Sequence, residues 1–308
     1  MCPTWPTSVR STWPVSDATR GTVTTGPVVF LHVPKTGGST LQRALTARFG
    51  TTHVGFRPRR AQQERTRHTG YEDRDPDDAA ARNQFAFEQW EALPAERRAA
   101  ARVVTGHVFF GFHERVRPPG AGPLAYLTLL REPLPRIRSL YGHRVRNGTL
   151  PPGFEDYLVS GEGWSLDNAQ VRRWATPGRG DLTGRVTPAM CDDACANLPT
   201  HGLAVGVTER FDESLVVIAH ALGVAPFPYE TTNRGVPALT QEGAASAAVD
   251  DFVARNQFDA VLHGVAVGRL DLAAELDALA RANRRDRWQR VVREPARIPR
   301  AVRARLRR

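Results

Sequence analysis

Residues 28–40 read Val28-Val29-Phe30-Leu31-His32-Val33-Pro34-Lys35-Thr36-Gly37-Gly38-Ser39-Thr40. The part up to Val33 is apolar, rich in β-branched residues and almost continuous, which predicts a strand buried in a parallel sheet. Pro34 and the two glycines end that strand, and apolar residues at helical spacing follow from Leu41 to Phe49. The stretch therefore predicts a strand, a glycine-rich turn and a helix, the unit from which parallel α/β folds are built.

The turn has the chemistry of an anion site. A glycine-rich turn before a helix presents backbone N–H groups and the positive end of the helix dipole to an anion. Lys35 adds a charge, and the hydroxyls of Thr36, Ser39 and Thr40 add hydrogen-bond donors. Lys35 is also the only lysine among the chain's 42 lysine and arginine residues, which favours a site that needs a compact ammonium. The predicted phosphate- or sulfate-binding residues are Lys35, Thr36, Gly37, Gly38, Ser39 and Thr40.

Strands and helices alternate along the rest of the chain. Further strands are predicted at 102–107, 124–130 and 201–207, with helices at 88–101, 134–145, 168–174, 214–222, 244–262 and 270–282. This alternation predicts an α/β, P-loop-like three-layer sandwich with a central parallel sheet flanked by helices. We expect an irregular N-terminal lead-in over 1–25, one domain over 26–280 with an exposed excursion at 57–82, and an Arg-rich tail over 281–308.

The turn is not a Walker A sequence, because Lys35 precedes both glycines instead of following the last one. A nucleoside triphosphatase also places a carboxylate for Mg²⁺ at the end of a neighbouring strand. Here the strand at 124–130 is followed by Arg131. The sequence thus predicts an anion site that needs no metal and argues against a P-loop nucleotide kinase.

The net charge of +10 comes from one end of the chain. Residues 281–308 contain twelve arginines against Asp286 and Glu294, so the remaining residues are formally neutral. Such a tail could contact an anionic membrane surface weakly. We expect a solvated extension and no nucleic-acid partner, and the sequence does not indicate the oligomeric state.

The chain lacks the marks of a membrane or secreted protein. No apolar run approaches the roughly 20 residues that a membrane-spanning helix needs, and the first residues lack the layout of a secretory signal. We therefore expect a soluble, cytoplasmic protein. Cys191 and Cys195 are one helical turn apart without partners for a tetrahedral metal site, so they are either a local disulfide or two inert thiols.

Two motifs in the expected order carry a family resemblance. Residues 30–40 resemble the 5′-phosphosulfate loop of the sulfotransferases that use 3′-phosphoadenosine 5′-phosphosulfate (PAPS), particularly the branch of the heparan sulfate 2-O-sulfotransferases and related bacterial carbohydrate sulfotransferases. Residues 130–141, Leu130-Arg131-Glu132-Pro133-Leu134-Pro135-Arg136-Ile137-Arg138-Ser139-Leu140-Tyr141, are similar to that family's 3′-phosphate motif. Weaker similarity at 105–108, 167–170 and 205–211 extends it over about residues 27–280.

The resemblance implies transfer of a sulfuryl group from PAPS to a hydroxyl, on a carbohydrate or glycoconjugate, leaving adenosine 3′,5′-bisphosphate. It implies that Lys35 contacts the bridging oxygen and the 5′-phosphate, and that Arg131 and Ser139 bind the 3′-phosphate. Asn233-Arg234-Gly235 is similar to the loop that closes over the adenosine, so Arg234 is a further candidate for the 3′-phosphate. A lipid or small-molecule hydroxyl as acceptor, or a non-catalytic nucleotide- or polyanion-binding protein, are the alternatives.

The acceptor hydroxyl needs a base, and histidine titrates in a suitable range. His107 follows a predicted strand, which places it at the same sheet edge as the Lys35 turn, and its Gly-His-Val context resembles the family's catalytic histidine segment. His113 is the reserve candidate and Glu114 the nearest carboxylate, whereas we expect His32 to pack in the core.

Other polar and aromatic residues remain open at this stage. Asn168, Gln170 and Arg172 either face a substrate or form a polar helix face. Trp164 and Trp174 either stack on a sugar or adenine ring or belong to the core.

Overall fold

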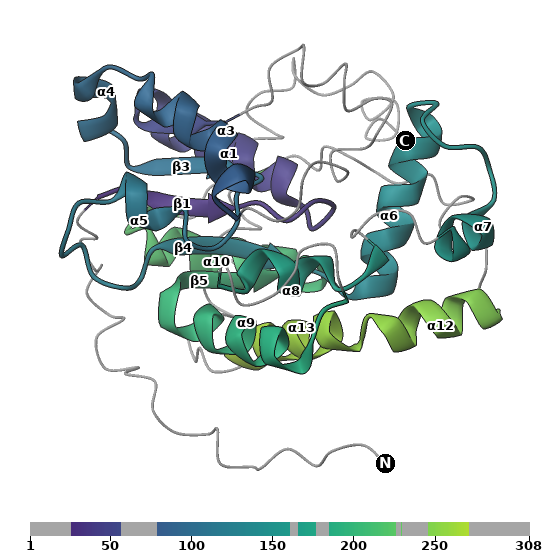
Figure 1. Cartoon of the computed structure of the whole chain (residues 1–308). Coiled ribbons are helices and arrows are strands. Elements are labelled where there is room, and N and C mark those ends of the chain that lie inside the picture. The colour runs from purple at the N-terminus through teal and green to yellow at the C-terminus, as the bar shows by residue number, and fades with distance from the viewer. Residues whose placement is uncertain are drawn as a thin grey trace, which may run out of the picture.

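The computed structural model describes residues 26–56, 79–160, 166–176, 185–225, 229 and 246–270. Its centre is a five-stranded sheet in the order β2-β3-β1-β4-β5, and every neighbouring pair is parallel (Figure 1). The strands are β1 (Val28–Leu31), β2 (His53–Gly55), β3 (Val103–Gly106), β4 (Tyr126–Leu130) and β5 (Gly202–Val207). The four predicted strands are confirmed, and the central one is the strand that precedes the Lys35 turn.

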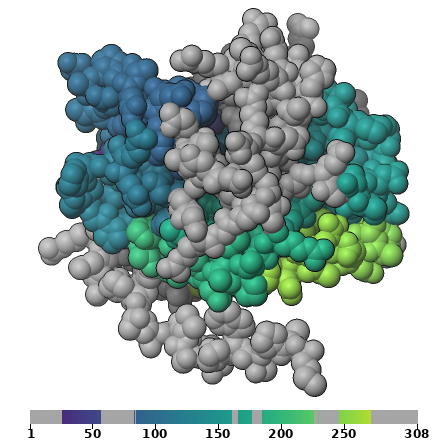
Figure 2. All heavy atoms as spheres, viewed as in Figure 1, coloured from purple at the N-terminus to yellow at the C-terminus, as the bar shows by residue number. Residues whose placement is uncertain are grey.

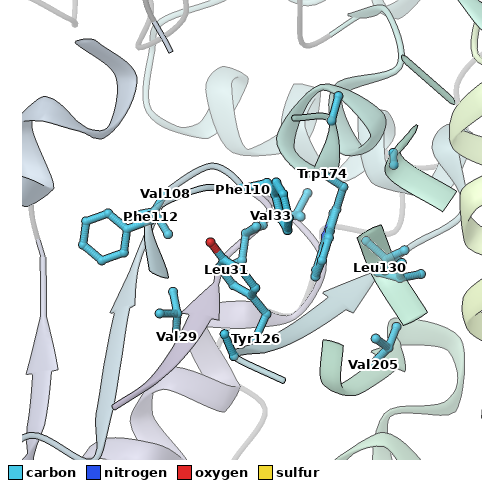
Figure 3. Packing of buried hydrophobic residues seen from close by; sticks show 14 of the residues in the cluster. Val29, Leu31, Val33, Val108, Phe110, Phe112, Tyr126, Leu130, Trp174 and Val205 are labelled. Atoms are coloured by element: carbon cyan, nitrogen blue, oxygen red, sulfur yellow. The ribbon is translucent and has the colours of Figure 1, made fainter. Parts of the chain in front are cut away.

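Helices cover both faces of the sheet, as the alternating pattern predicts. Val28 and Phe30 pack with α1 (Gly38–Phe49) and α10 (Phe211–Ala221) on one face. Val29 and Leu31 face the opposite core, which includes side chains from α3 (Ala79–Glu91), α8 (Ala169–Trp174), α9 (Pro188–His201) and α13 (Gln257–Leu270). Figure 3 shows this second core, where the rings of Phe110, Tyr126 and Trp174 meet beside Leu31. Trp174 is fully buried and is therefore a core residue.

A third apolar cluster lies outside the sheet. It joins α6 (Pro133–Arg146), α7 (Phe154–Val159) and α12 (Ala247–Arg255). These three helices lie together at one side of the sheet, and their surfaces adjoin in the space-filling view (Figures 1 and 2). Because α6 begins directly after β4, this cluster borders the carboxyl end of the sheet.

Two predicted helices differ from the structure, and several elements were not predicted. The helix expected over 88–101 is two, because α3 ends at Glu91 and Pro94 precedes the short α4 (Ala95–Ala99). The helix expected over 244–262 is broken at Asn256, between α12 and α13, where the Asn256 amide donates to Leu166 O at 2.8 Å. Not predicted are β2, α9, the short α5 (His113–Val116) and the 3-10 turns at Gly50–Thr52 and Thr208–Arg210.

No helix within the described residues has both the length and the apolar composition that crossing a membrane requires.

Candidate functional site

The strand order marks the place where a ligand is expected. From β1 the chain moves to β2 and β3 on one side, and from β4 it moves to β5 on the other. In open parallel sheets, ligands bind at the carboxyl ends of the strands where the order switches direction. Here that point lies between β1 and β4, so Lys35 and Arg131 both follow strands that end there.

The turn after β1 is held in an unusual backbone shape. Lys35 has φ 69° and Gly37 has φ 82°, both in the left-handed region, which costs energy for a residue with a side chain. The Thr36 side chain is buried, and its hydroxyl donates to Val33 O at 2.9 Å. This hydrogen bond stabilises the turn itself. Ser39 is exposed in the first turn of α1, and that first turn contains no acidic residue. The turn is thus preorganised, with the amino end of a 12-residue helix open to an anion.

Both glycines are needed at this turn for steric reasons. A Cβ added to Gly38 would lie 2.0 Å from Cδ2 of His32, and one added to Gly37 would lie 2.9 Å from the Phe211 ring. The His32 side chain therefore packs directly under the turn. As predicted, His32 is buried, with 6% of its surface exposed.

Arg131 reaches across from β4 to the turn. Its Nη1 donates to the backbone oxygen of Lys35 at 3.1 Å, joining the two motifs that the sequence analysis paired. Burial lowers the pKa of Arg131, while the nearby Glu209 opposes that shift. The Nε of Arg131 is buried and has no hydrogen-bond partner among the described residues. Arg131 therefore has donor capacity left at this point.

Positive charge concentrates around Lys35. Burial lowers its pKa to about 8, and the positive charges of Arg146 and Arg131 add to the shift. The pKa of His143 is also lowered by burial, and then by Lys35 and Arg146. Within the described part of the chain, Lys35 forms no ion pair with a carboxylate. Like charges gathered in a partly buried place are electrostatically costly, and a bound anion would reduce that cost.

Ser139 lies on the face of α6 that borders this charge. Arg136, Ser139, His143 and Arg146 recur at helical spacing, so they share one face of α6. His143 and Arg146 on that face both interact electrostatically with Lys35. Ser139 is half-buried and, by helical spacing, lies between Arg136 and His143 on this face of α6.

His107 lies at the same sheet end, one residue beyond β3. The pairing of Leu31 with Gly106 brings it beside His32, and the two rings stack with centroids 4.4 Å apart. Nδ1 of His107 is 2.9 Å from His32 O, and because a carbonyl only accepts, Nδ1 carries the hydrogen. Burial and the nearby Arg173 lower the His107 pKa to about 4. At neutral pH the ring is therefore neutral, with its lone pair on Nε2.

His32 connects the turn to His107. One part of its ring packs against Gly38, and its face stacks on the His107 ring. Burial lowers the pKa of His32, and the neighbouring His107, Arg173 and Lys35 add to that shift. A neutral, buried histidine thus separates the anion turn from the candidate base and fixes their spacing.

The reserve base is at the wrong end of the sheet. After β3 the chain turns back over the sheet. This is shown by the His113 N–H, which donates to the hydroxyl of Tyr126 at the start of β4. The His113 ring is also close to His201, which precedes β5. His113 and the adjacent Glu114 therefore lie at the amino end of the sheet, away from Lys35.

The polar residues of α8 point inward and not to a substrate. Asn168 is buried, and its side chain donates to Arg255 O and accepts from Asp259 N. Arg172 is buried and forms an ion pair with Asp167 at 2.5 Å. Gln170 is buried and hydrogen-bonds the backbone of Arg131. The two alternatives left open by the sequence were a substrate-facing role and a polar helix face, and the structure instead places all three side chains in buried hydrogen-bonded positions.

Several residues named from the sequence lie outside the described residues, and the two cysteines are not part of a metal site. Trp164, Arg234, the 57–78 part of the excursion and the 281–308 tail lie outside the described ranges. Cys191 and Cys195 are free thiols, not a disulfide. Among the described side chains, no group of three or more His, Cys, Asp or Glu is arranged to hold a metal ion.

Three residues around the site were not singled out from the sequence, and the contact that Gln170 makes was not predicted. His143 and Arg146 could have been found from their helical spacing to Arg136 and Ser139, because that periodicity predicts one shared face. Arg173 and the contact of Gln170 with Arg131 depend on how α8 packs against the sheet, for which the local sequence carries no signal.

Comparisons with known proteins add little to this site. No family model matches the chain, and no curated protein matches it. Among solved structures, the chain is similar to a sulfotransferase from Alicyclobacillus acidocaldarius, with 19% sequence identity over 77% of this chain and 96% of that one and a TM-score of 0.40. A likeness this low does not place the chain in a family, so its function has to be argued from the site itself.

Proposed function

We propose that this protein is a sulfotransferase that moves a sulfuryl group from PAPS to an acceptor hydroxyl. The observation that carries the proposal is the hydrogen bond from Arg131 Nη1 to Lys35 O. It unites, at one sheet end, the two segments that resemble the 5′-phosphosulfate and 3′-phosphate motifs. A nucleotide with phosphates at both ends needs two cationic groups in one site. This contact brings the residues that carry them, Lys35 and Arg131, next to each other.

The described residues fit such a donor. Lys35 is partly desolvated among like charges, and a buried Nε of Arg131 lacks a partner in the described part of the chain. Both features favour an anion with several oxygens. The Lys35 turn and the first turn of α1 would hold the 5′ end, and Arg131 with Ser139 would hold the 3′-phosphate. Arg234, outside the described residues, remains a candidate for the same phosphate.

The roles of Lys35 and His107 follow from charge and protonation. PAPS supplies a sulfuryl group whose bond to the 5′-phosphate oxygen breaks as a new S–O bond forms to the acceptor oxygen. Lys35 would stabilise the negative charge that develops on the departing phosphate oxygen. Nε2 of His107 would accept the proton of the acceptor hydroxyl and later release it to water. The products are a sulfate ester and adenosine 3′,5′-bisphosphate.

The acceptor is proposed as a carbohydrate on the resemblance alone, which is a weaker warrant than the site itself. A lipid or a small-molecule hydroxyl is the alternative acceptor.

The test is sulfate transfer from labelled PAPS to pools of carbohydrate, lipid and small hydroxylated acceptors. We expect labelled product from one pool, together with one adenosine 3′,5′-bisphosphate per sulfate ester. Tight binding of the bisphosphate without transfer to any pool would instead favour a nucleotide-binding protein. Absence of nucleotide binding would overturn the proposal.

A further inference from the structure

The side chain of Gln170 hydrogen-bonds both backbone groups of Arg131. Gln170 Nε2 donates to Arg131 O at 2.7 Å, and Gln170 Oε1 accepts from Arg131 N at 2.9 Å. The carboxamide thus satisfies both backbone groups of one residue, as a neighbouring strand would. Because Gln170 has none of its surface exposed, water does not compete for these two bonds.

Gln170 is itself held at its backbone. The carboxylate of Asp259, on α13, accepts from the N–H of Gln170 at 3.0 Å and from the N–H of Val171 at 2.8 Å. Asp259 is fully buried, and its own N–H donates to Asn168 Oδ1. A chain of buried hydrogen bonds therefore runs from α13 through the start of α8 to Arg131.

Arg131 needs this support because of its location. It is the first residue after β4 and therefore lies beyond the last ladder pair of that strand, Leu130 with Val207. Its guanidinium must nevertheless meet the oxygen of Lys35, a residue whose backbone is in the left-handed region. A small rotation of the Arg131 backbone would move the guanidinium by ångströms at the end of its long side chain.

We propose that Gln170 is a positioning residue, which fixes the Arg131 backbone so that the guanidinium stays beside the Lys35 turn and in reach of the nucleotide. Gln170 does not touch the nucleotide in this scheme and acts only through Arg131. The inference rests on the proposed function, since it assumes that the anion bound between Lys35 and Arg131 is a nucleotide.

The test compares two amides that both anchor α8. Gln170→Met keeps the length of the side chain and removes both hydrogen bonds to Arg131. Asn197→Leu is the matched control, because the Asn197 amide donates to Trp174 O at 2.9 Å at the other end of α8 and does not contact Arg131. Binding of adenosine 3′,5′-bisphosphate is measured by calorimetry and stability by thermal unfolding. We expect both variants to lose stability, and only Gln170→Met to bind the bisphosphate roughly tenfold or more weakly.

A second variant separates positioning from simple destabilisation. In Gln170→Glu, an ionised carboxylate repels Arg131 O, whereas a protonated carboxyl restores the original pattern of one donor and one acceptor. The ratio of its bisphosphate affinity to that of the wild type, measured from pH 8 to pH 5.5, should therefore rise as the pH falls. A general loss of packing would give a ratio that does not depend on pH in this way.

The outcomes distinguish this inference from the proposed function. If the wild-type protein does not bind the bisphosphate, the proposed function fails. If the wild type binds and Gln170→Met binds equally well, or no more weakly than Asn197→Leu, the role of Gln170 is overturned while the function stands. A pH-independent ratio for Gln170→Glu would also overturn it.

Discussion

The two ends of the sheet each carry a partly buried histidine with a pKa of about 4. His107 lies at the carboxyl end and His113 at the amino end, and burial is the main cause of the lowered pKa in both. Each ring also uses Nδ1 in a hydrogen bond, His107 with His32 O at 2.9 Å and His113 with Tyr126 Oη at 2.9 Å. Judged by titration alone, the two histidines are equivalent.

Their surroundings differ. Next to His107 stands His32, whose ring also packs against Gly38 at the amino end of α1. Around His113 stand the rings of Phe110, Tyr126 and His201, and burial raises the pKa of the Tyr126 hydroxyl. A histidine with a lowered pKa therefore indicates a reaction site only where a helix amino end and cationic side chains also lie nearby. In a parallel sheet that place is the carboxyl end.

The largest expected effect comes from replacing each histidine in turn. His107→Ala should lower turnover by about 10³-fold or more, because the general base is lost. His113→Ala should leave turnover nearly unchanged and lower stability, because the buried Tyr126 hydroxyl loses a partner. Turnover with labelled PAPS and thermal unfolding of both variants check this. Wild-type turnover in His107→Ala would show that the wrong base was chosen.

A smaller effect is expected from Lys35→Ala. This change removes the lysine ammonium from the carboxyl end of the sheet, so that this end resembles the amino end more closely. Turnover should fall by about 10²- to 10³-fold, because the charge on the departing phosphate oxygen is no longer stabilised. Arg43→Ala is the matched control, since Arg43 is an exposed cation on α1. Equal losses of turnover in the two variants would show that Lys35 contributes only general positive charge.

Arg131→Ala should weaken binding of adenosine 3′,5′-bisphosphate by about 10- to 100-fold, because a charged hydrogen bond to a phosphate is lost. Calorimetric titration measures the change. Arg115→Ala serves as control, since Arg115 is a surface residue that pairs with Glu91. An affinity that stays at the wild-type value would remove Arg131 from the nucleotide site.

The smallest effect is a pH dependence. Lys35 loses its proton as pH rises through about 8, so kcat/KM should fall by up to about tenfold per pH unit above that value. His107 stays neutral down to about pH 4, so no loss of activity from its protonation is expected near pH 6.5. Lys35→Arg should move the basic limb to higher pH. A basic limb that stays in place in that variant would assign it to another group.

Acid should also destabilise the fold through both histidines. Their folded-state pKa lies below the unfolded value of about 6.5, so unfolding takes up protons and stability falls as pH drops below about 6.5. His107 and His113 share this behaviour, and therefore the stability profile does not distinguish the two ends, whereas turnover does.

The sequence predicts much of the fold because local patterns dominate there. The continuous apolar run before Lys35, the following glycines and the apolar spacing from Leu41 each carry a signal within a few residues, and the structure has β1 and α1 at those places. The three-residue β2 was not predicted, because a strand so short has no measurable periodicity.

The site was predictable where chemistry follows directly after a strand. Lys35, His107 and Arg131 come after β1, β3 and β4, so parallel pairing brings them to one end. Gln170 acts on a residue 39 positions away in sequence, and this contact depends on how α8 packs against the sheet. The reserve candidate His113 lies at the other end of the sheet for a similar reason, since the turn back over the sheet after β3 leaves no mark in the local pattern.

The central claim is that Lys35 and Arg131 belong to one nucleotide site at the switch between β1 and β4. A crystal structure of the protein with adenosine 3′,5′-bisphosphate tests it directly. We predict the 5′-phosphate on the backbone of the Lys35 turn and the 3′-phosphate on Arg131 and Ser139. A nucleotide bound elsewhere, or bound with neither phosphate at these residues, would contradict the account.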